Sequence, residues 1–380
     1  MIKFESTTKL ILSDNLASDI GAIVRDEMPK NITVILDANI AGQESVVKML
    51  EAIETIAAVK AVTVKSAEPT TDMVNEYAGK LRKVKTGLYI GIGGGSVLDL
   101  TKALSVMTVN AGKVEEYHGT GKIFTSGVKK MMVPTTAGTG SEVTGGAVLV
   151  NERTKFKRGI GGKYVIPDYA ILDASLTATM PDSITASTGM DAIGHAVESY
   201  TARCANDITR IYSKEAFRLV YNNLPKVLND RQNMDLRRKV LLGSTLAGIA
   251  IANSNTGACH SISYAMGLYH NIPHGLAVAY LLPAVVKINM EKGCNLYADL
   301  YDLIDVADKG LSIRMKAERF SSDLSVYGPL SCLTKKFSDY GVTEKNRGFI
   351  AKRGLDLTPA LSNNPVEFGL EEALRVLREV

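Results

Sequence analysis

Short apolar runs rich in β-branched residues alternate with helix-period segments over the first half of the chain. Between the runs, apolar positions recur at helical spacing in residues 41–54, 71–84 and 97–107, which predicts three helices. Strands that alternate with helices form a parallel sheet covered on both faces, and ligands of such a sheet bind at the carboxyl ends of its strands. The runs predicted to be buried strands are Asn31–Asp37, Ala61–Val64, Gly87–Gly93 and Lys130–Pro134.

The pattern changes after about residue 180. Beyond this point helical periodicity dominates, and strands no longer alternate with helices. We therefore expect an α/β domain over residues 1–180 and an all-α domain over residues 181–380. The clearest predicted helices of the second domain are Pro181–Val197, Arg210–Leu228 and Leu236–Asn253.

Composition narrows the class of protein. The 380 residues carry a net charge of +4, from 44 basic and 40 acidic side chains, without a basic stripe interleaved with aromatic residues, so we expect no nucleic-acid partner. The four cysteines lie far apart and form no CxxC pair, which favours a reducing compartment. The N-terminus lacks the apolar run of a signal peptide, and no apolar stretch is long enough to cross a bilayer. We expect a cytoplasmic protein with no membrane partner.

A glycine-rich turn follows the predicted strand Gly87–Gly93. Gly93, Gly94 and Gly95 let a pyrophosphate approach the backbone closely, because no Cβ stands in the way. We expect Ser96 to cap the helix that follows, whose N-terminal N–H groups attract an anion. The turn lacks the spacing G-x-G-x-x-G, so it is not an ordinary Rossmann fingerprint. The alternative is a tight strand-to-helix turn that binds nothing.

A second turn of this kind follows the strand Lys130–Pro134. Its hydroxyls and backbone amides suit contacts to phosphate, ribose or the nicotinamide carboxamide. The alternative is a hydroxyl-rich loop stabilised by its own side-chain bonds. Two such turns in one α/β domain favour a dinucleotide. The residues concerned are Thr135, Thr136, Gly138, Thr139, Gly140 and Ser141.

Asp37 ends the predicted strand Asn31–Asp37. A carboxylate at this place bonds the hydroxyls of an adenine ribose and repels a 2′-phosphate, which predicts NAD over NADP. Asp is also a common first residue of a turn, and this is the alternative interpretation.

Four of the five histidines lie in two short segments. Asp191 and His195 are four residues apart on a predicted helix and therefore share one face. His260 and His274 follow in a second segment, and one carboxylate with three imidazoles suits Fe²⁺, Zn²⁺ or Co²⁺. A lone Asp-x-x-x-His is more often a helix-surface pair, and a lone buried histidine is more often a satisfied core residue. The clustering of all four residues favours a metal site.

The segments GGGS, PTTAGTGSEVT, TGMDAIGHAVES, CHSISYAMG and PHG occur in this order along the chain. In this combination the chain resembles the iron-dependent (group III) alcohol dehydrogenases, most densely over residues 86–280. The resemblance implies a dehydroquinate synthase-like architecture, with an N-terminal dinucleotide-binding α/β domain and a helical C-terminal domain. It also implies an oxidoreductase that transfers a hydride between an alcohol, aldehyde or ketone and NAD, with iron, or alternatively zinc, as the metal. We expect a homodimer.

The resemblance also carries over to individual residues. It implies four metal ligands, namely Asp191, His195, His260 and His274. It implies dinucleotide contacts at Asp37, Gly94, Gly95, Ser96, Thr135 and Thr136.

One departure from the family concerns the proton relay. Many members carry a second histidine four residues after the third ligand, where this chain has Tyr264. We predict that His270 carries the proton, because an imidazole ordinarily titrates near neutrality and Pro273 should break the helix and leave His270 in a loop. Tyr264, one helical turn after His260, is expected to donate a stabilising hydrogen bond. The segment SNNPVEF, residues 362–368, keeps only a faint likeness to the family.

Several alternatives to a simple alcohol dehydrogenase stay open. Enzymes like glycerol dehydrogenase or dehydroquinate synthase share the architecture but usually bind their metal through three residues, and a maleylacetate-reductase-like enzyme needs no metal. A branch that oxidises 3-deoxy-octulosonate sugars has a faint likeness, and a non-catalytic sensor of metal and nucleotide is the alternative from another class. The basic segment 154–163, with Lys155, Lys157, Arg158 and Lys163, either receives an acidic group of the substrate or is a solvated hairpin.

Overall fold

The computed structural model describes residues 4–65, 68–154 and 156–380. These residues form two compact units. The first, here called the sheet unit, contains Ser6–Thr136 and Ser141–Thr179. The second, here called the helical unit, contains Met180–Val380, the N-terminal residues through Glu5 and the short segment Ala137–Gly140.

A six-stranded, all-parallel sheet is the centre of the sheet unit, with the strand order β1-β9-β6-β4-β2-β3. Every described residue of β2 and β4 is buried or nearly so, which explains their central place in the sheet. The strands are β1 (Lys9–Ser13), β2 (Asn31–Asp37), β3 (Ala58–Val64), β4 (Leu88–Gly93), β6 (Lys129–Pro134) and β9 (Tyr169–Asp173).

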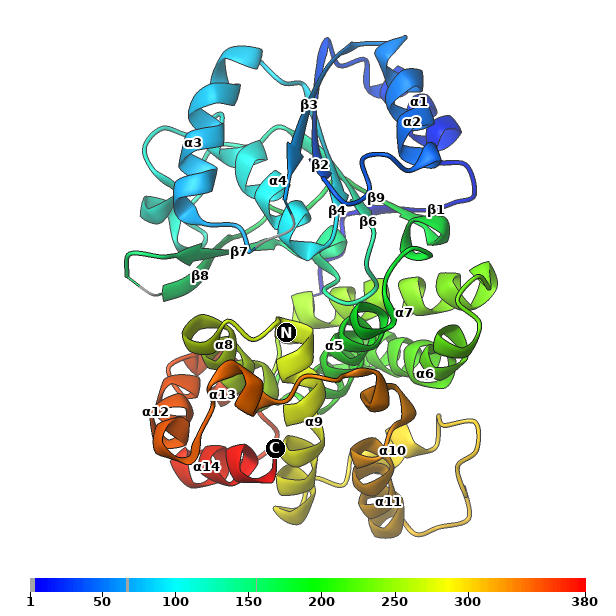
Figure 1. Cartoon of the computed structure of the whole chain (residues 1–380), viewed down its shortest axis with the longest axis vertical. Helices are drawn as coiled ribbons and strands as arrows, with labels where there is room; N and C mark the ends of the chain where they lie inside the picture. The colour runs from blue at the N-terminus through cyan, green and yellow to red at the C-terminus, as the bar shows by residue number, and fades with distance from the viewer. Residues whose placement is uncertain (1–3, 66–67, 155) are drawn as a thin grey trace. The chain divides into compact units, whose positions relative to one another are not determined.

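Helices cover both faces of this sheet (Figure 1). On β2, Ile32, Val34 and Leu36 pack into a core with the first two helices, whereas Ile35 points into the opposite core. This alternation along one strand is what a sheet buried on both faces requires. The helices are α1 (Leu16–Glu27) and α2 (Glu44–Glu54) on one face, and α3 (Thr71–Leu81) and α4 (Gly95–Met107) on the other.

A small second sheet has the strand order β5-β8-β7 and was not expected from the sequence. Its strands are β5 (Gly119–Thr120), β7 (Gly146–Asn151) and β8 (Phe156–Gly161). Strands β7 and β8 are antiparallel neighbours, so the basic segment forms part of a hairpin. In it, Lys157 pairs with Glu68, and Lys155 lies outside the described residues.

The helical unit is built around α5, whose residues are buried almost without interruption from Thr185 onward. Helices α6, α7 and α9 pack against it (Figure 1). Ten helices belong to the described part of this unit: α5 (Asp182–Thr201), α6 (Asp207–Asn229), α7 (Met234–Ser254), α8 (Ala258–His270), α9 (His274–Glu291), α10 (Tyr297–Tyr301), α11 (Ile313–Ser325), α12 (Glu344–Gly354), α13 (Thr358–Ser362) and α14 (Leu370–Glu379).

Short 3-10 helices complete the secondary structure. They are η1 (Arg82–Val84), η2 (Val114–Tyr117), η3 (Ser141–Val143), η4 (Ala174–Thr177), η5 (Gly328–Cys332) and η6 (Phe337–Tyr340). A parallel α/β part followed by a helical part confirms the predicted fold class. In the described ranges, no helix combines the length and apolar character that a membrane crossing needs.

Candidate metal centre and nucleotide site

Two ligand candidates come from the buried interior of α5. Asp191 and His195 lie one helical turn apart, so their side chains leave the same face of the helix. They are 2% and 5% exposed. Burial at this level is costly for a carboxylate that has no compensating charge or hydrogen bond.

The other two histidines lie near the starts of two consecutive helices. His260 is the third residue of α8, and His274 is the first residue of α9. Between the helices, Asn271 adopts a left-handed conformation with φ 54°, and Pro273 is the N-cap residue of α9. The break expected at Pro273 is therefore present, but His270 is the last residue of α8 and not part of a loop.

The three histidine side chains converge on one oxygen of Asp191. The distances from Asp191 Oδ1 to the histidine Nε2 atoms are 3.9 Å for His195, 3.4 Å for His260 and 3.5 Å for His274. The His195 and His260 rings stack with centroids 4.5 Å apart, and the centroid of the His274 ring lies 5.3 Å from that of His260.

Two buried polar atoms at this point lack a hydrogen-bond partner among the described residues, Asp191 Oδ1 and His260 Nε2. Leaving such an atom unsatisfied costs about 1–3 kcal/mol. A divalent cation among these atoms satisfies both, and three imidazoles with one carboxylate are a donor set that iron and zinc accept. The residues present therefore fit a divalent metal.

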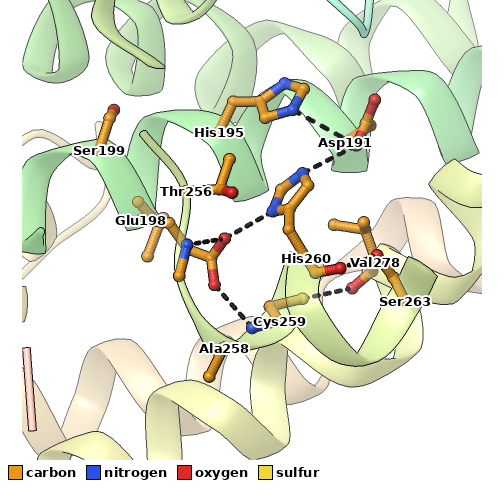
Figure 2. Close-up of polar contacts among 12 residues, drawn as sticks. Asp191, His195, Glu198, Ser199, Thr256, Ala258, Cys259, His260, Ser263 and Val278 are labelled. Atoms are coloured by element: carbon orange, nitrogen blue, oxygen red, sulfur yellow. Dashed lines mark hydrogen bonds and ion pairs between the residues drawn. The ribbon is translucent and has the colours of Figure 1, made fainter. Parts of the chain in front are cut away.

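Hydrogen bonds from the far side of the rings orient two of the ligands, and Figure 2 shows the one between His260 and Glu198. His195 Nδ1 donates to the carbonyl of Gly138 at 3.2 Å, and His260 Nδ1 donates to Glu198 Oε2 at 2.5 Å. His274 Nδ1 lies 3.4 Å from the hydroxyl of Ser263. A histidine whose Nδ1 carries the proton presents the lone pair of Nε2 to a metal.

The electrostatics of the site favour an ionised carboxylate. Burial opposes ionisation of Asp191, but the neighbouring imidazoles hold its pKa well below the ordinary value. Burial lowers the pKa of His195 to about 4, although Asp191 opposes the shift. Burial also acts to lower the pKa of His260, but the carboxylates of Glu198 and Asp191 outweigh it and raise this pKa to about 9.

The first glycine turn joins β4 to α4 in the sheet unit. A Cβ on Gly93 would lie 2.7 Å from Val97 Cβ, so this turn requires a glycine. Gly94 is the N-cap residue of α4, whereas we had expected Ser96 to cap it. The cap prediction is wrong because the helix begins at Gly95, which makes Ser96 its second residue. The first backbone N–H groups of α4 thus remain suited to an anion.

The second turn lies beside the first. A Cβ on Gly94 would lie 3.4 Å from Thr136 Cγ2, and Thr135 N donates to the carbonyl of Gly93 at 3.0 Å. The hydroxyl of Ser141 donates to Asp99 Oδ1 at 2.5 Å. Its bond to Asp99 shows that Ser141 also has a structural role.

Asp99 and the buried Lys102 form a network that sequence reasoning missed. The Lys102 ammonium lies 2.9 Å from Asp99 Oδ1 and 3.0 Å from the carbonyl of Ser141, and it also contacts the carbonyl of Gly146. Asp99 Oδ2 accepts from the backbone N–H of Val148 at 2.8 Å. The sequence did offer a signal for this network: two opposite charges lie three residues apart in an otherwise apolar helix that follows a glycine turn.

Asp37 is 6% exposed at the end of β2. Its Oδ1 accepts from Asn39 N at 2.9 Å and from Asn39 Nδ2 at 3.0 Å. Asp37 therefore starts a turn, and both of these bonds use the same carboxylate oxygen.

The structure places the two relay candidates differently. The Tyr264 ring lies 5.4 Å from the His274 ring, centroid to centroid. His270 lies ten residues after His260 on α8, about 15 Å along the helix axis. Its Nδ1 donates to the carbonyl of Tyr340, in η6, at 3.0 Å.

Comparisons with known proteins cover both units. Residues 7–174 match the family described as iron-containing alcohol dehydrogenase, and residues 185–380 match the family described as Fe-containing alcohol dehydrogenase family, C-terminal. The sulfoacetaldehyde reductase of Bilophila wadsworthia is 31% identical over 319 residues, which cover 82% of this chain and 81% of the relative. The 1,3-propanediol dehydrogenase of Klebsiella pneumoniae is 31% identical over 311 residues, covering 82% and 80%.

Solved structures agree with these relatives. The sulfoacetaldehyde reductase from Bifidobacterium kashiwanohense in complex with NAD⁺ superposes with a TM-score of 0.87 at 26% identity. The superposition covers all of this chain and 98% of that one.

Proposed function

Because the chain belongs to the family of iron-containing alcohol dehydrogenases, we propose that Asp191, His195, His260 and His274 hold its catalytic metal. The enzyme transfers a hydride between an alcohol or aldehyde and NAD, with iron as the metal of the family. The family expected from the sequence motifs is thereby confirmed. The observation that carries the ligand proposal is the convergence of three Nε2 atoms on Asp191 Oδ1. Two of these four atoms, Asp191 Oδ1 and His260 Nε2, are buried and have no hydrogen-bond partner among the described residues.

Each part of the site has a task in this reaction. A metal bound there supplies a Lewis acid that polarises the substrate oxygen. We propose that Gly93, Gly94 and Gly95 and the first N–H groups of α4 bind the pyrophosphate of NAD. We propose that Thr135, Thr136 and Ser141 border the nicotinamide half, and that Ser96 contributes its hydroxyl to the cofactor from the first turn of α4.

The substrate class we infer is a short alcohol or aldehyde. Two relatives at 31% identity are named for sulfoacetaldehyde and 1,3-propanediol, which are both two- or three-carbon compounds with a polar far end. The comparisons do not favour oxidation of a 3-deoxy-octulosonate sugar or a glycerol-dehydrogenase-like activity.

The proton relay remains a proposal with two candidates. The bond of His270 Nδ1 to a backbone carbonyl leaves Nε2 as the atom that accepts and releases a proton. Tyr264, whose ring lies against the ligand His274, is the candidate for a stabilising hydrogen bond to the substrate.

We also infer a homodimer in the cytoplasm without a nucleic-acid partner. The edge strand β1 leaves 40% of Leu10 and 54% of Leu12 exposed, which suits a contact with a second subunit. Each of the four cysteines is a free thiol, which fits a reducing compartment. Sedimentation velocity tests the dimer, and a species of 40.8 kDa would contradict it.

The metal assignment is tested by analysis of the purified protein. We expect one divalent metal per chain in the wild type and loss of most metal and turnover in His260→Ala and His274→Ala. His118→Asn is the matched control, because the fifth histidine lies in the sheet unit, and it should keep its metal. Full occupancy in both ligand variants would overturn the assignment.

A further inference from the structure

We propose that Glu198 is a positioning residue that holds His260 in the orientation and tautomer required for metal binding. Glu198 is on α5, three residues after His195, and only 5% exposed. This inference rests on the proposed assignment of His260 as a metal ligand. The sequence pattern gave Glu198 no role, although it lies in the segment TGMDAIGHAVES, because its partners lie about sixty residues further along the chain.

The Glu198 carboxylate accepts three hydrogen bonds from the start of α8 (Figure 2). Its Oε2 accepts from His260 Nδ1 at 2.5 Å and from Gly257 N at 2.9 Å. Its Oε1 accepts from Cys259 N at 2.7 Å. The first N–H groups of a helix have no partner within the helix, so Glu198 caps α8 from a neighbouring helix.

One carboxylate thus fixes both the imidazole and the backbone that carries it. Because a carboxylate only accepts, His260 Nδ1 must carry a proton, which leaves Nε2, the ring atom that faces Asp191, as the atom that would give its lone pair to a metal. Gly257 permits the close approach, since a Cβ there would lie 2.9 Å from Glu198 Oε1.

Charge balance supports the same role. Asp191 and Glu198 are both buried and both contact His260. Their two negative charges balance those of a divalent cation, so the buried group as a whole is neutral with metal bound and three neutral imidazoles. A residue that merely capped a helix would need no charge.

The test replaces Glu198 by glutamine, which keeps the shape of the side chain. Its amide offers one acceptor oxygen and one NH₂ group where three donors meet, so at least one of these donors faces an N–H of the amide. We expect Glu198→Gln to bind Zn²⁺ about 10–100-fold more weakly, as is usual when a partner of a metal-binding histidine is lost. The measurement is competition for Zn²⁺ against a chromophoric chelator, with the melting temperature of the metal-free protein recorded alongside.

Asn364→Ala is the matched control for the cap alone. Asn364 Oδ1 accepts from Ala258 N at 3.4 Å, at the same helix start, and the structure gives Asn364 no contact with the four proposed ligands among the residues described. This variant should lower the melting temperature of the metal-free protein and keep its Zn²⁺ affinity within about threefold. The inference is wrong if the Zn²⁺ affinity of Glu198→Gln stays within threefold of the wild-type value. It is also wrong if Glu198→Gln loses no more Zn²⁺ affinity than Asn364→Ala.

Glu198→Asp decides the matter if the glutamine variant does not fold. It keeps the charge but is one methylene shorter, so it cannot hold both the ring and the helix start, and we expect about a tenfold loss of Zn²⁺ affinity. Wild-type affinity in Glu198→Asp would overturn the inference. A different result would refute the proposed function: if the wild-type protein bound no Zn²⁺, the metal site itself would be wrong, whatever the role of Glu198.

Discussion

Gly140 is a position where even a methyl group should be destabilising. Its φ is +61°, and a Cβ built on it would lie 2.4 Å from Gly248 Cα and 3.0 Å from Gly248 N. Both neighbours are backbone atoms of α7, so no side-chain rotation relieves the overlap. Gly140 also ends the segment whose Gly138 carbonyl accepts the hydrogen bond from His195.

The cost of Gly140→Ala has two parts. An L-residue in the left-handed region costs about 1–2 kcal/mol. Overpacking against a fixed neighbour costs about 1–3 kcal/mol more. We therefore expect a loss of about 2–5 kcal/mol in the free energy of unfolding.

Gly341→Ala separates the two parts within the same unit. The φ of Gly341 is +76°, and none of the described atoms lies within 4 Å of the added Cβ. Gly341→Ala should therefore lose only the conformational part of the free energy of unfolding, about 1–2 kcal/mol. The assay is urea unfolding followed by circular dichroism at 222 nm, because the chain has no tryptophan for fluorescence. Equal losses in the two variants would refute the argument that Gly140 is held against the α7 backbone.

Three further predictions concern the cofactor and the relay. Asp37→Gly should gain turnover with NADP, because the repulsion of the 2′-phosphate disappears; a wild type that uses both cofactors equally would contradict this. Ser141→Ala should raise the KM for NAD by at most about fivefold, because binding must then order a loop that has lost a hydrogen bond to Asp99 worth roughly 1 kcal/mol; an unchanged KM would show that this bond does not contribute to cofactor binding. His270→Asn should lower kcat and alter its pH profile, whereas Tyr264→Phe keeps the profile shape; the reverse result would exchange the two roles.

The sequence pattern predicted the centre of the sheet better than its edges. Strand β2 has the predicted bounds, because its apolar run is buried on both faces. Strand β3 begins at Ala58, three residues before the predicted run, and its exposed Lys60 hides the pattern, as expected for an edge strand. Strands β1 and β9 and the three-stranded sheet were missed, because short strands carry little periodicity of their own.

The site divides in the same way between local and distant signals. The one-turn spacing of Asp191 and His195 is local, and the sequence therefore predicted a shared face correctly. The partners of Glu198 lie 59 to 62 residues further along the chain, so no spacing rule reveals them. The capping role expected for Ser96 was wrong because a residue type does not fix the residue at which a helix begins.

The segment Ala137–Gly140 limits how the two halves of such an enzyme can be recombined. It belongs to the helical unit although it lies some forty residues before the boundary near residue 180 in the sequence. A chimera made with a single crossover at residue 180 would pair this helical unit with a foreign loop, and a side chain in place of Gly140 would then collide with Gly248. A chimera that keeps the helical unit intact must take residues 137–140 from the same parent as the C-terminal half. The helical unit is therefore encoded by separate stretches of the gene.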